Sequence, residues 1–240
     1  MSEVGKLLSY SAVGERLKVV QSRLAAAAER AQRTPNDVTL IAISKTHPAE
    51  AIKSLVQLGV TDVGENRVQE AESKIYDVGR HSARWHLVGH LQANKARKAV
   101  KLFDVIHSLD SVELAERLNR LCIEQGRDKL QVLIQVELGG ELTKSGIKEP
   151  EVATLARSVA ALERLELIGL MTLPPFFADP EATRPYFAKL RELRDKLAGQ
   201  GLFGDQRGEL SMGMTNDFET AIEEGATMVR VGTAIFGERA

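Results

Sequence analysis

One lysine, Lys45, ends a short apolar run with the sequence TLIAISK that begins at Thr39. The residues THPAE follow at once, so the run is typical of a buried parallel strand that leads into a helix. Lysine is seldom buried without a partner or a purpose, and α/β folds place their chemistry at the carboxyl ends of parallel strands. An amine there could form a Schiff base with an aldehyde, provided that burial or a neighbour lowers its pKa. The alternative is a surface lysine on a strand-to-helix loop.

Two glycine-containing segments near the carboxyl terminus could bind a phosphate group. Segment 211–214 reads SMGM and segment 230–233 reads RVGT, and each lies at the end of a predicted strand. Glycine lets backbone N–H groups approach phosphate oxygens, the hydroxyls can donate hydrogen bonds, and Arg230 can supply charge. The alternative is a pair of ordinary turns, which are common at strand ends.

Short apolar runs and amphipathic helical patterns alternate along the chain. Eight strands are predicted, at 39–45, 62–66, 85–90, 105–109, 131–138, 166–171, 209–213 and 228–232. Helices are predicted at roughly 8–32, 48–58, 67–77, 93–102, 111–125, 150–162, 180–199 and 216–224. Ser111 and the pair Asp179-Pro180 mark helix starts, because their side chains suit the first turn of a helix.

The alternation of strand and helix implies parallel strands with right-handed crossovers. Eight such units in 240 residues favour one α/β domain over residues 1–240, a closed (β/α)8 TIM barrel with an extra N-terminal helix. An open doubly wound sheet is the main alternative, but it usually has a glycine-rich turn after its first strand, and here that turn reads SKTHP. In such a barrel the loops after strands seven and eight often bind phosphate, and they face the same mouth as Lys45.

A ligand that carries both an aldehyde and a phosphate would suit this mouth, and pyridoxal 5'-phosphate is such a ligand. Arg230 could instead lie against its pyridine nitrogen, where a cation would keep the ring unprotonated and weaken its capacity as an electron sink. Asn66 ends the second predicted strand, where its amide could reach a ring oxygen. His90 ends the third, where it could face the mouth or have a structural role.

Composition excludes several other classes of protein. The chain has 32 basic and 33 acidic residues, so nothing points to a nucleic acid or an anionic membrane as a partner. No apolar run approaches the ~18 residues of a membrane span, and the first residues resemble no signal peptide. The single cysteine, Cys122, excludes an internal disulfide. We therefore expect a cytoplasmic protein that is a monomer or weak dimer.

No metal site or familiar catalytic motif is predicted. His86 and His90 lie on one face of a strand, and no third ligand is apparent. The chain lacks a P-loop and the patterns GxGxxG, HExxH, CxxC and GxSxG.

Six segments resemble the pyridoxal phosphate homeostasis proteins, the YggS/PROSC family, in the expected order along nearly the whole chain. They are SKTHP with Lys45, GENRVQE (64–70), WHLVGHLQANK (85–95), GLMTLPPF (169–176), LSMGMTND (210–217) and VRVGTAIFGER (229–239). Several long motifs in sequence are far more specific than a lone glycine pattern.

This resemblance implies a barrel similar to the N-terminal domain of bacterial alanine racemase, with pyridoxal phosphate held as a Schiff base on Lys45. It also implies a set of pocket residues around that lysine: Asn66, Ser211, Gly213, Arg230, Gly232 and Thr233. The family is thought to keep vitamin B6 and amino-acid pools balanced without an established reaction, so apo-enzymes that use the cofactor are candidate recipients. His47 stands where many members have a second lysine.

Two alternatives stay open. The first is an amino-acid racemase or decarboxylase that uses the same cofactor. A racemase of the alanine type needs an opposing tyrosine from a second domain, whereas Tyr10, Tyr76 and Tyr186 all fall in predicted helices and we expect no second domain. The second is a barrel that binds another phosphorylated metabolite, with Lys45 as an ion-pair partner.

Overall fold

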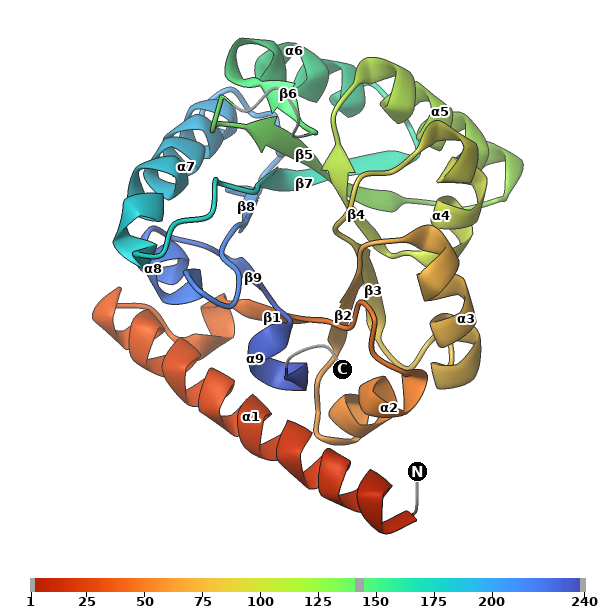
Figure 1. Ribbon diagram of the computed structural model, residues 1–240. Helices are drawn as coiled ribbons and strands as arrows, with labels where there is room; N and C mark the ends of the chain where they lie inside the picture. Colours follow the sequence, from red (N-terminus) through yellow and green to blue (C-terminus); the bar gives the residue numbers. More distant parts are fainter. Residues whose placement is uncertain (1–2, 141–144, 238–240) are drawn as a thin grey trace.

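In the computed structural model, eight parallel strands close into a barrel, as Figure 1 shows down its axis. The structure describes residues 3–140 and 145–237. The strands are β1 (Thr39–Ile43), β2 (Asp62–Glu65), β3 (Arg84–Leu87), β4 (Val105–Leu109), β5 (Leu130–Glu137), β7 (Leu165–Thr172), β8 (Glu209–Ser211) and β9 (Met228–Val231). Pairing of β1 with both β2 and β9, and of β4 with β5, closes the ring. The predicted TIM barrel is therefore confirmed.

Helices surround the barrel on its outer side (Figure 1). They are α2 (Ala49–Gln57), α3 (Val68–Val78), α4 (Ala96–Leu102), α5 (Val112–Glu124), α6 (Glu149–Ala160), α7 (Arg184–Ala198) and α8 (Phe218–Glu223), with short 3-10 turns η1 (Pro35–Asp37), η2 (Ala93–Lys95) and η3 (Pro180–Thr183). Two predicted starts are confirmed. The Ser111 hydroxyl accepts a hydrogen bond from the N–H of Leu114, and the Asp179 carboxylate accepts one from the N–H of Glu181.

Two small elements were not predicted from the sequence. Strand β6 (Ile147–Lys148) pairs with the end of β5, where Ile147 lies opposite Val136. Helix α9 (Thr233–Phe236) is a single turn directly after β9, where no helix was predicted. Both are too short to give a periodic pattern, which explains why the sequence does not reveal them.

Helix α1 (Glu3–Arg30) precedes the first strand, as predicted, and packs against α8 and α9. Its buried face includes Leu17, Val20 and Leu24. Its Arg16 donates hydrogen bonds to the carbonyl oxygens of Ile235 and Phe236 at 2.8 and 3.1 Å. Helix α1 therefore fixes α9, the turn that follows the last strand of the barrel.

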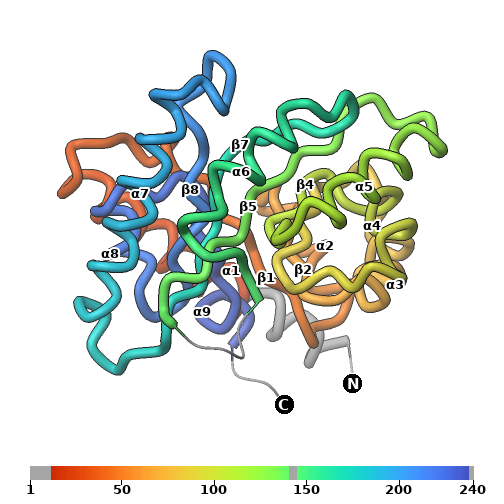
Figure 2. Tube along the Cα trace, turned by 90° about the horizontal axis from the view of Figure 1, so that it is seen from above, coloured from red at the N-terminus to blue at the C-terminus, as the bar shows by residue number. Residues whose placement is uncertain are grey.

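Figure 2 shows the barrel from the side, with α9 at one end and the segment before β8 projecting at the other. The hydrophobic core has two parts. A large cluster fills the space between strands and helices, and a smaller one within the barrel contains Ile41, Ile43, Val105, Leu133, Met171 and Met228. Buried polar side chains accompany this inner cluster, which matters for the site described below. Among the described residues, no helix combines the length and apolarity needed to cross a membrane.

Candidate functional site

Lys45 lies at the mouth of the barrel, the end where the strands finish. Strand register gives its neighbours: Ile43 pairs with Gly64 on β2, and Ile41 pairs with Arg230 on β9. Lys45 comes two residues after Ile43 and four after Ile41, so it is flanked by Asn66 on one side and by the turn after β9 on the other. Its side chain is half-buried and makes no hydrogen bond or ion pair with any described residue. The predicted lysine is thus at the mouth with its amine uncommitted.

A buried ion-pair network holds the backbone on both sides of Lys45. The ammonium of Lys74 on α3 lies 2.6 Å from the carbonyl oxygen of Ser44, 2.6 Å from Glu65 Oε1 and 2.7 Å from Glu70 Oε1. Glu65 also accepts a hydrogen bond from the Ser44 hydroxyl, and Glu70 accepts one from the N–H of Thr46. This network explains why GENRVQE contains two glutamates.

Thr46 has a φ of +67°, in the left-handed region that a β-branched residue rarely occupies. Such a conformation persists only where the surroundings impose it, and the hydrogen bond to Glu70 is part of that constraint. Glu65, Glu70 and Lys74 were not among the predicted site residues. The spacing of Glu70 and Lys74, four residues apart on one helix, was the available signal.

The two glutamates of this network titrate in opposite directions. Burial raises the pKa of Glu65, and the hydrogen bonds from Lys74 and Ser44 offset that effect only in part. For Glu70, burial also acts to raise the pKa, but the hydrogen bonds from Lys74 and from the N–H of Thr46 outweigh it and the pKa is lowered. The more exposed carboxylate is thus held firmly in its charged form beside the Lys45 segment.

The loops after β8 and β9 lie against each other at the mouth. The N–H of Arg230 donates to the carbonyl oxygen of Gly213 at 3.0 Å, and the N–H of Ala234 lies 3.5 Å from Thr215 Oγ1. Gly213 has a φ of +90°, and a Cβ there would lie 2.6 Å from the Cβ of Ala221. Only glycine fits at this position, and the approach of its backbone to a phosphate stays a prediction.

Gly232 and Thr233 form the facing part of the mouth. A Cβ on Gly232 would lie 3.2 Å from the carbonyl oxygen of Ile43, so the turn after β9 passes close to the end of β1. Thr233 begins α9 and its side chain is exposed. The loop after β1 also contacts α9, because the ring of His47 stacks on that of Phe236 with centroids 4.8 Å apart.

Ser211 and Arg230 point into the barrel and lie below the loops. Ser211 is fully buried, and its hydroxyl accepts a hydrogen bond from Arg230 Nη1 at 2.6 Å and lies 2.9 Å from His107 Nδ1. Arg230 Nη2 donates to the carbonyl oxygen of Thr172 at 2.9 Å. Burial lowers the pKa of Arg230 to about 10, partly offset by Asp217, so it is a cation at neutral pH. The phosphate contact predicted for Ser211 stays a prediction, and its hydroxyl already has two partners.

Asn66 and His90 occupy the part of the mouth next to Lys45. Asn66 follows β2 and is half-buried, and its backbone packs so closely on Gly89 that a Cβ on Gly89 would lie 2.2 Å from the Asn66 carbonyl oxygen. His90 is about half exposed, with Nδ1 3.6 Å from Asp110 Oδ2. Burial raises the pKa of Asp110, and His90 partly offsets this. Glycine at position 89 therefore sets how the loops after β2 and β3 meet.

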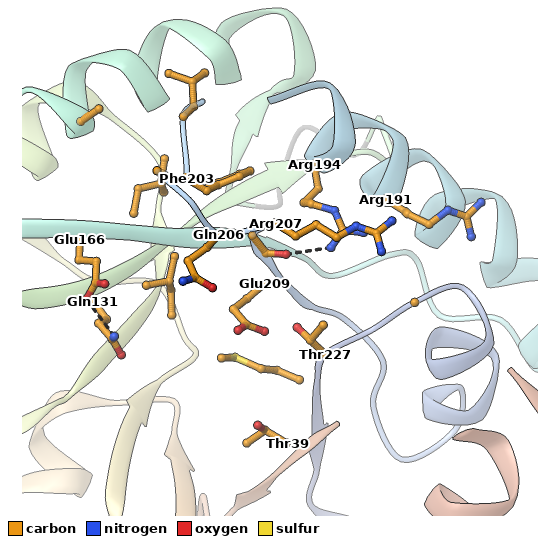
Figure 3. A pocket seen from close by; sticks show the side chains of 18 of the residues that line it. Thr39, Gln131, Glu166, Arg191, Arg194, Phe203, Gln206, Arg207, Glu209 and Thr227 are labelled. Atoms are coloured by element: carbon orange, nitrogen blue, oxygen red, sulfur yellow. Dashed lines mark hydrogen bonds between the residues drawn. The ribbon is translucent and has the colours of Figure 1, made fainter. Parts of the chain in front are cut away.

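A cavity of about 1000 Å³ opens at the opposite end of the barrel, where the strands begin (Figure 3). It is lined by Thr39, Gln131, Glu166 and Glu209 from the strand starts and by Arg191 and Arg194 from α7. Its arginines are largely committed, for example Arg194 to Asp195 and to the carbonyl oxygen of Gly208. The residues at the mouth, and not those of this cavity, therefore make up the candidate functional site. Within residues 3–140 and 145–237, no cluster of histidine, cysteine and carboxylate side chains is arranged to hold a metal ion.

The comparisons with known proteins agree with this geometry. Residues 17–240 match the family model for the alanine racemase N-terminal domain. A pyridoxal phosphate homeostasis protein from Aquifex aeolicus is 43% identical over 225 residues, which are 94% of this chain and 97% of that protein. The chain belongs to the pyridoxal phosphate homeostasis protein family. The resemblance expected from the six motifs is thus confirmed.

Solved structures place this family member among barrels of the same kind. PipY of Synechococcus elongatus PCC7942, solved with PLP bound, is 39% identical with a TM-score of 0.81, covering 94% of this chain and all of that one. An alanine racemase from Corynebacterium glutamicum is only 18% identical, with a TM-score of 0.71 over 95% of this chain and 62% of that one, so it shares the fold. The predicted likeness to the alanine racemase N-terminal domain is therefore confirmed for the fold.

Proposed function

We propose that this chain binds pyridoxal 5'-phosphate at the barrel mouth, with Lys45 as covalent anchor through a Schiff base. We further propose that it serves intracellular vitamin B6 and amino-acid homeostasis without catalytic turnover, as a cytoplasmic monomer that supplies apo-enzymes. The observation that carries this proposal is the placement of an uncommitted lysine between Asn66 and the paired loops after β8 and β9. The names of its relatives and the PLP bound to PipY support it.

The residues at the mouth fit the chemistry of this cofactor. The unprotonated amine of Lys45 can attack an aldehyde carbon, and water leaves as the double bond to nitrogen forms. The backbone around Gly213 and Gly232, with the hydroxyls of Thr215 and Thr233, can donate hydrogen bonds to a phosphate. These groups come from loops that are already in contact, which supports their assignment to one phosphate site.

Arg230 suits the ring of the cofactor better than its phosphate. Its guanidinium lies inside the barrel, two residues before Gly232, and is bonded to Ser211 and to the carbonyl oxygen of Thr172. No described carboxylate makes a hydrogen bond to this buried cation. A fixed cation close to the pyridine nitrogen would keep the ring unprotonated and weaken it as an electron sink, which supports a role in holding the cofactor over one in turnover.

The first experiment is an absorption spectrum of the protein incubated with pyridoxal phosphate, before and after borohydride, followed by peptide mass mapping. We expect a visible band that disappears on reduction and an added mass on the peptide with Lys45. Lys45→Ala should lose the band and retain weak binding through the phosphate loops. Lys53→Ala, which changes an exposed lysine on the neighbouring helix α2, is the matched control and should behave as wild type.

A stoichiometric, borohydride-stable adduct in Lys45→Ala would show that Lys45 is the wrong lysine. The racemase or decarboxylase alternative is tested on the same preparation by chiral chromatography of a panel of amino acids. Conversion above a control with free cofactor would overturn the non-catalytic part of the proposal, whereas no conversion above that control is the expected result.

A further inference from the structure

A continuous line of hydrogen bonds crosses the interior of the barrel. It joins one side chain from each of five strands: Asp62 on β2, His86 on β3, His107 on β4, Ser211 on β8 and Arg230 on β9. Arg230 Nη1 lies 2.6 Å from the Ser211 oxygen, which lies 2.9 Å from His107 Nδ1. His107 Nε2 lies 2.9 Å from His86 Nδ1, and His86 Nε2 lies 2.9 Å from Asp62 Oδ1.

This line is shielded from water over almost its whole length. His86, His107 and Ser211 are fully buried, and only Asp62, the first residue of β2, is slightly exposed at the end of the barrel away from the mouth. There Arg84 Nη1 lies 3.7 Å from Asp62 Oδ1. Buried polar groups are stabilising only when each is satisfied, and here every member of the line has partners on both sides.

The Asp62 end of the line fixes the position of every proton up to Ser211. An ionised carboxylate can only accept, so His86 carries its proton on Nε2 and donates it to Asp62. His86 Nδ1 then accepts from His107, which carries its proton on Nε2 and leaves Nδ1 to accept from the Ser211 hydroxyl. The Arg230 guanidinium can only donate, so it donates to the Ser211 oxygen. Both imidazoles are neutral Nε2–H tautomers in this arrangement.

The surrounding charges favour the same arrangement. Burial lowers the pKa of His86, partly offset by Asp62, with smaller effects of Arg84 and Asp104. Burial lowers the pKa of His107 further, and His86, Arg230 and Arg84 add to this. Burial acts to raise the pKa of Asp62, but hydrogen bonds from His86 and Thr61 outweigh it, so Asp62 stays ionised. The reverse proton order would need a protonated Asp62 and is therefore disfavoured.

We propose that His107 is a positioning residue for the cofactor site, which acts by fixing the polarity of Ser211, and that His86 and Asp62 set the tautomer of His107. Because the Ser211 proton is directed to His107, the oxygen lone pairs of Ser211 face the guanidinium and hold Arg230 in one place as a cation. This inference rests on the proposed function for the role of Arg230 at the ring. The proton order itself is independent of that function.

The proton order is tested by NMR of the ¹⁵N-labelled, cofactor-free protein, in which ring-nitrogen shifts distinguish the two neutral tautomers and the cation. We expect His86 and His107 to be neutral Nε2–H tautomers between about pH 7 and about pH 8.5, and burial, which lowers the pKa of both, to delay their protonation to lower pH than that of an ordinary imidazole. The exposed His81 provides a histidine signal from outside the barrel for comparison. An Nδ1–H tautomer or a cation at either buried histidine in this range overturns the proposal.

The positioning role is tested by two substitutions of one histidine. In His107→Asn the amide reaches the position of Nδ1 and can still accept from Ser211, whereas in His107→Gln it reaches that of Nε2 and can contact only His86. We expect the Kd for pyridoxal phosphate to rise roughly tenfold or more in His107→Gln, because Ser211 then lacks the partner that turns its lone pairs to the charged Arg230, and a hydrogen bond to a charged group is worth about this factor. His107→Asn should stay within about threefold of wild type, since it keeps the bond to Ser211.

Equal losses of affinity in the two variants, or no loss in either, would overturn the positioning role. Melting temperatures of both variants show whether each folds, and the NMR test on the wild-type chain needs no variant. Failure of the proposed function can be distinguished from failure of the positioning role. If the proposed function fails, the wild-type chain lacks a borohydride-sensitive band, regardless of which tautomers NMR finds for His86 and His107.

Discussion

The ammonium of Lys74 lies 2.6 Å from the carbonyl oxygen of Ser44, the residue that immediately precedes Lys45. The same ammonium is paired with Glu65 and Glu70, and both lysine and Glu65 are almost fully buried. Lys74, on helix α3, therefore holds the backbone just before Lys45 and so sets the direction in which Lys45 leaves the strand. The charge of Lys74 is balanced by the two carboxylates. The two lysines thus differ in role. Lys74 holds the backbone, whereas the amine of Lys45 makes no hydrogen bond or ion pair with any described residue.

Lys74→Met is expected to destabilise the protein by about 3–5 kcal/mol, because it leaves the buried carboxylate of Glu65 without its cation. Urea unfolding of the cofactor-free protein measures this cost. Lys98→Met is the matched control, since Lys98 pairs with Glu72 at the surface and such pairs contribute less than about 1 kcal/mol.

The double variant Lys74→Met/Glu65→Gln should recover part of the lost stability, because the unpaired charge is removed with its partner. A cost for Lys74→Met no larger than that for Lys98→Met would show that the network does not hold the Ser44–Thr46 segment.

Asp104 makes the stability of the folded protein depend on pH in the acidic range. Arg80 donates to both of its carboxylate oxygens, at 2.9 and 2.6 Å, and the N–H of Trp85 donates at 2.8 Å. Burial acts to raise the pKa of Asp104, but these hydrogen bonds outweigh it, so the pKa lies below the ordinary value of 3.8. At low pH the unfolded chain then binds more protons than the folded protein. The stability that Asp104 contributes is therefore fully present above the unfolded pKa of 3.8 and is lost as the pH falls through the lower pKa of the folded protein.

Asp104→Asn should therefore cost stability at neutral pH, roughly 1–3 kcal/mol for the lost charged hydrogen bonds. The difference from wild type should shrink as pH is lowered from about 5 to about 3, because protonation removes the same interactions from the wild type. Asp205→Asn, on an exposed turn, is the control and should differ from wild type by less than about 0.5 kcal/mol. A difference for Asp104→Asn that is constant with pH would contradict this account. Urea midpoints at several pH values give the answer.

Local signals in the sequence account for most of the fold. Strand and helix periodicity predicted all eight barrel strands to within a few residues, and Ser111 and Asp179 marked helix starts through the hydrogen bonds seen in the structure. The order of strands also brought Lys45, Gly213 and Gly232 to one mouth, since parallel strands end together.

The interior of the barrel could not be predicted in the same way. Ser211 and His107 are 104 residues apart in the chain, and nothing local indicates that their side chains meet. The inward direction of Arg230 depends on the register of β9 against β1, where one residue of shift turns a side chain to the other face. His86 was considered only as a metal ligand, because its partners Asp62 and His107 come from separate strands.

Gly89 is predicted to be irreplaceable at the mouth. A Cβ at this position would lie 2.2 Å from the carbonyl oxygen of Asn66, and backbone has to move to relieve such a contact. Gly89→Ala should cost about 1–3 kcal/mol or more and weaken cofactor retention, because Asn66 and His90 are displaced. Gly199→Ala is the control, since a Cβ there would meet nothing closer than 3.5 Å, and it should leave both melting temperature and retention unchanged. Unchanged retention in Gly89→Ala would remove Asn66 and His90 from the site.

The phosphate assignment predicts a difference between two ligands. Thr233→Val removes one exposed hydroxyl and Thr215→Val removes the hydroxyl facing the N–H of Ala234, with the shape of each side chain kept. Each variant should bind pyridoxal phosphate roughly tenfold more weakly, as expected for a lost hydrogen bond to a charged group. Binding of pyridoxal, which lacks the phosphate, should not change, and equilibrium titrations with both ligands measure the ratio.

Ser211→Ala provides the contrast to these threonine variants. If Ser211 acts by holding Arg230 at the ring, its loss should weaken pyridoxal and pyridoxal phosphate by the same factor, because both ligands carry the ring. If Ser211 instead contacts the phosphate, as its motif suggested, only pyridoxal phosphate should be weakened. The ratio of the affinities for pyridoxal and pyridoxal phosphate therefore distinguishes a residue of the barrel interior from a residue of the phosphate loops. If Thr233→Val weakened the binding of both ligands equally, the phosphate would lie elsewhere at the mouth.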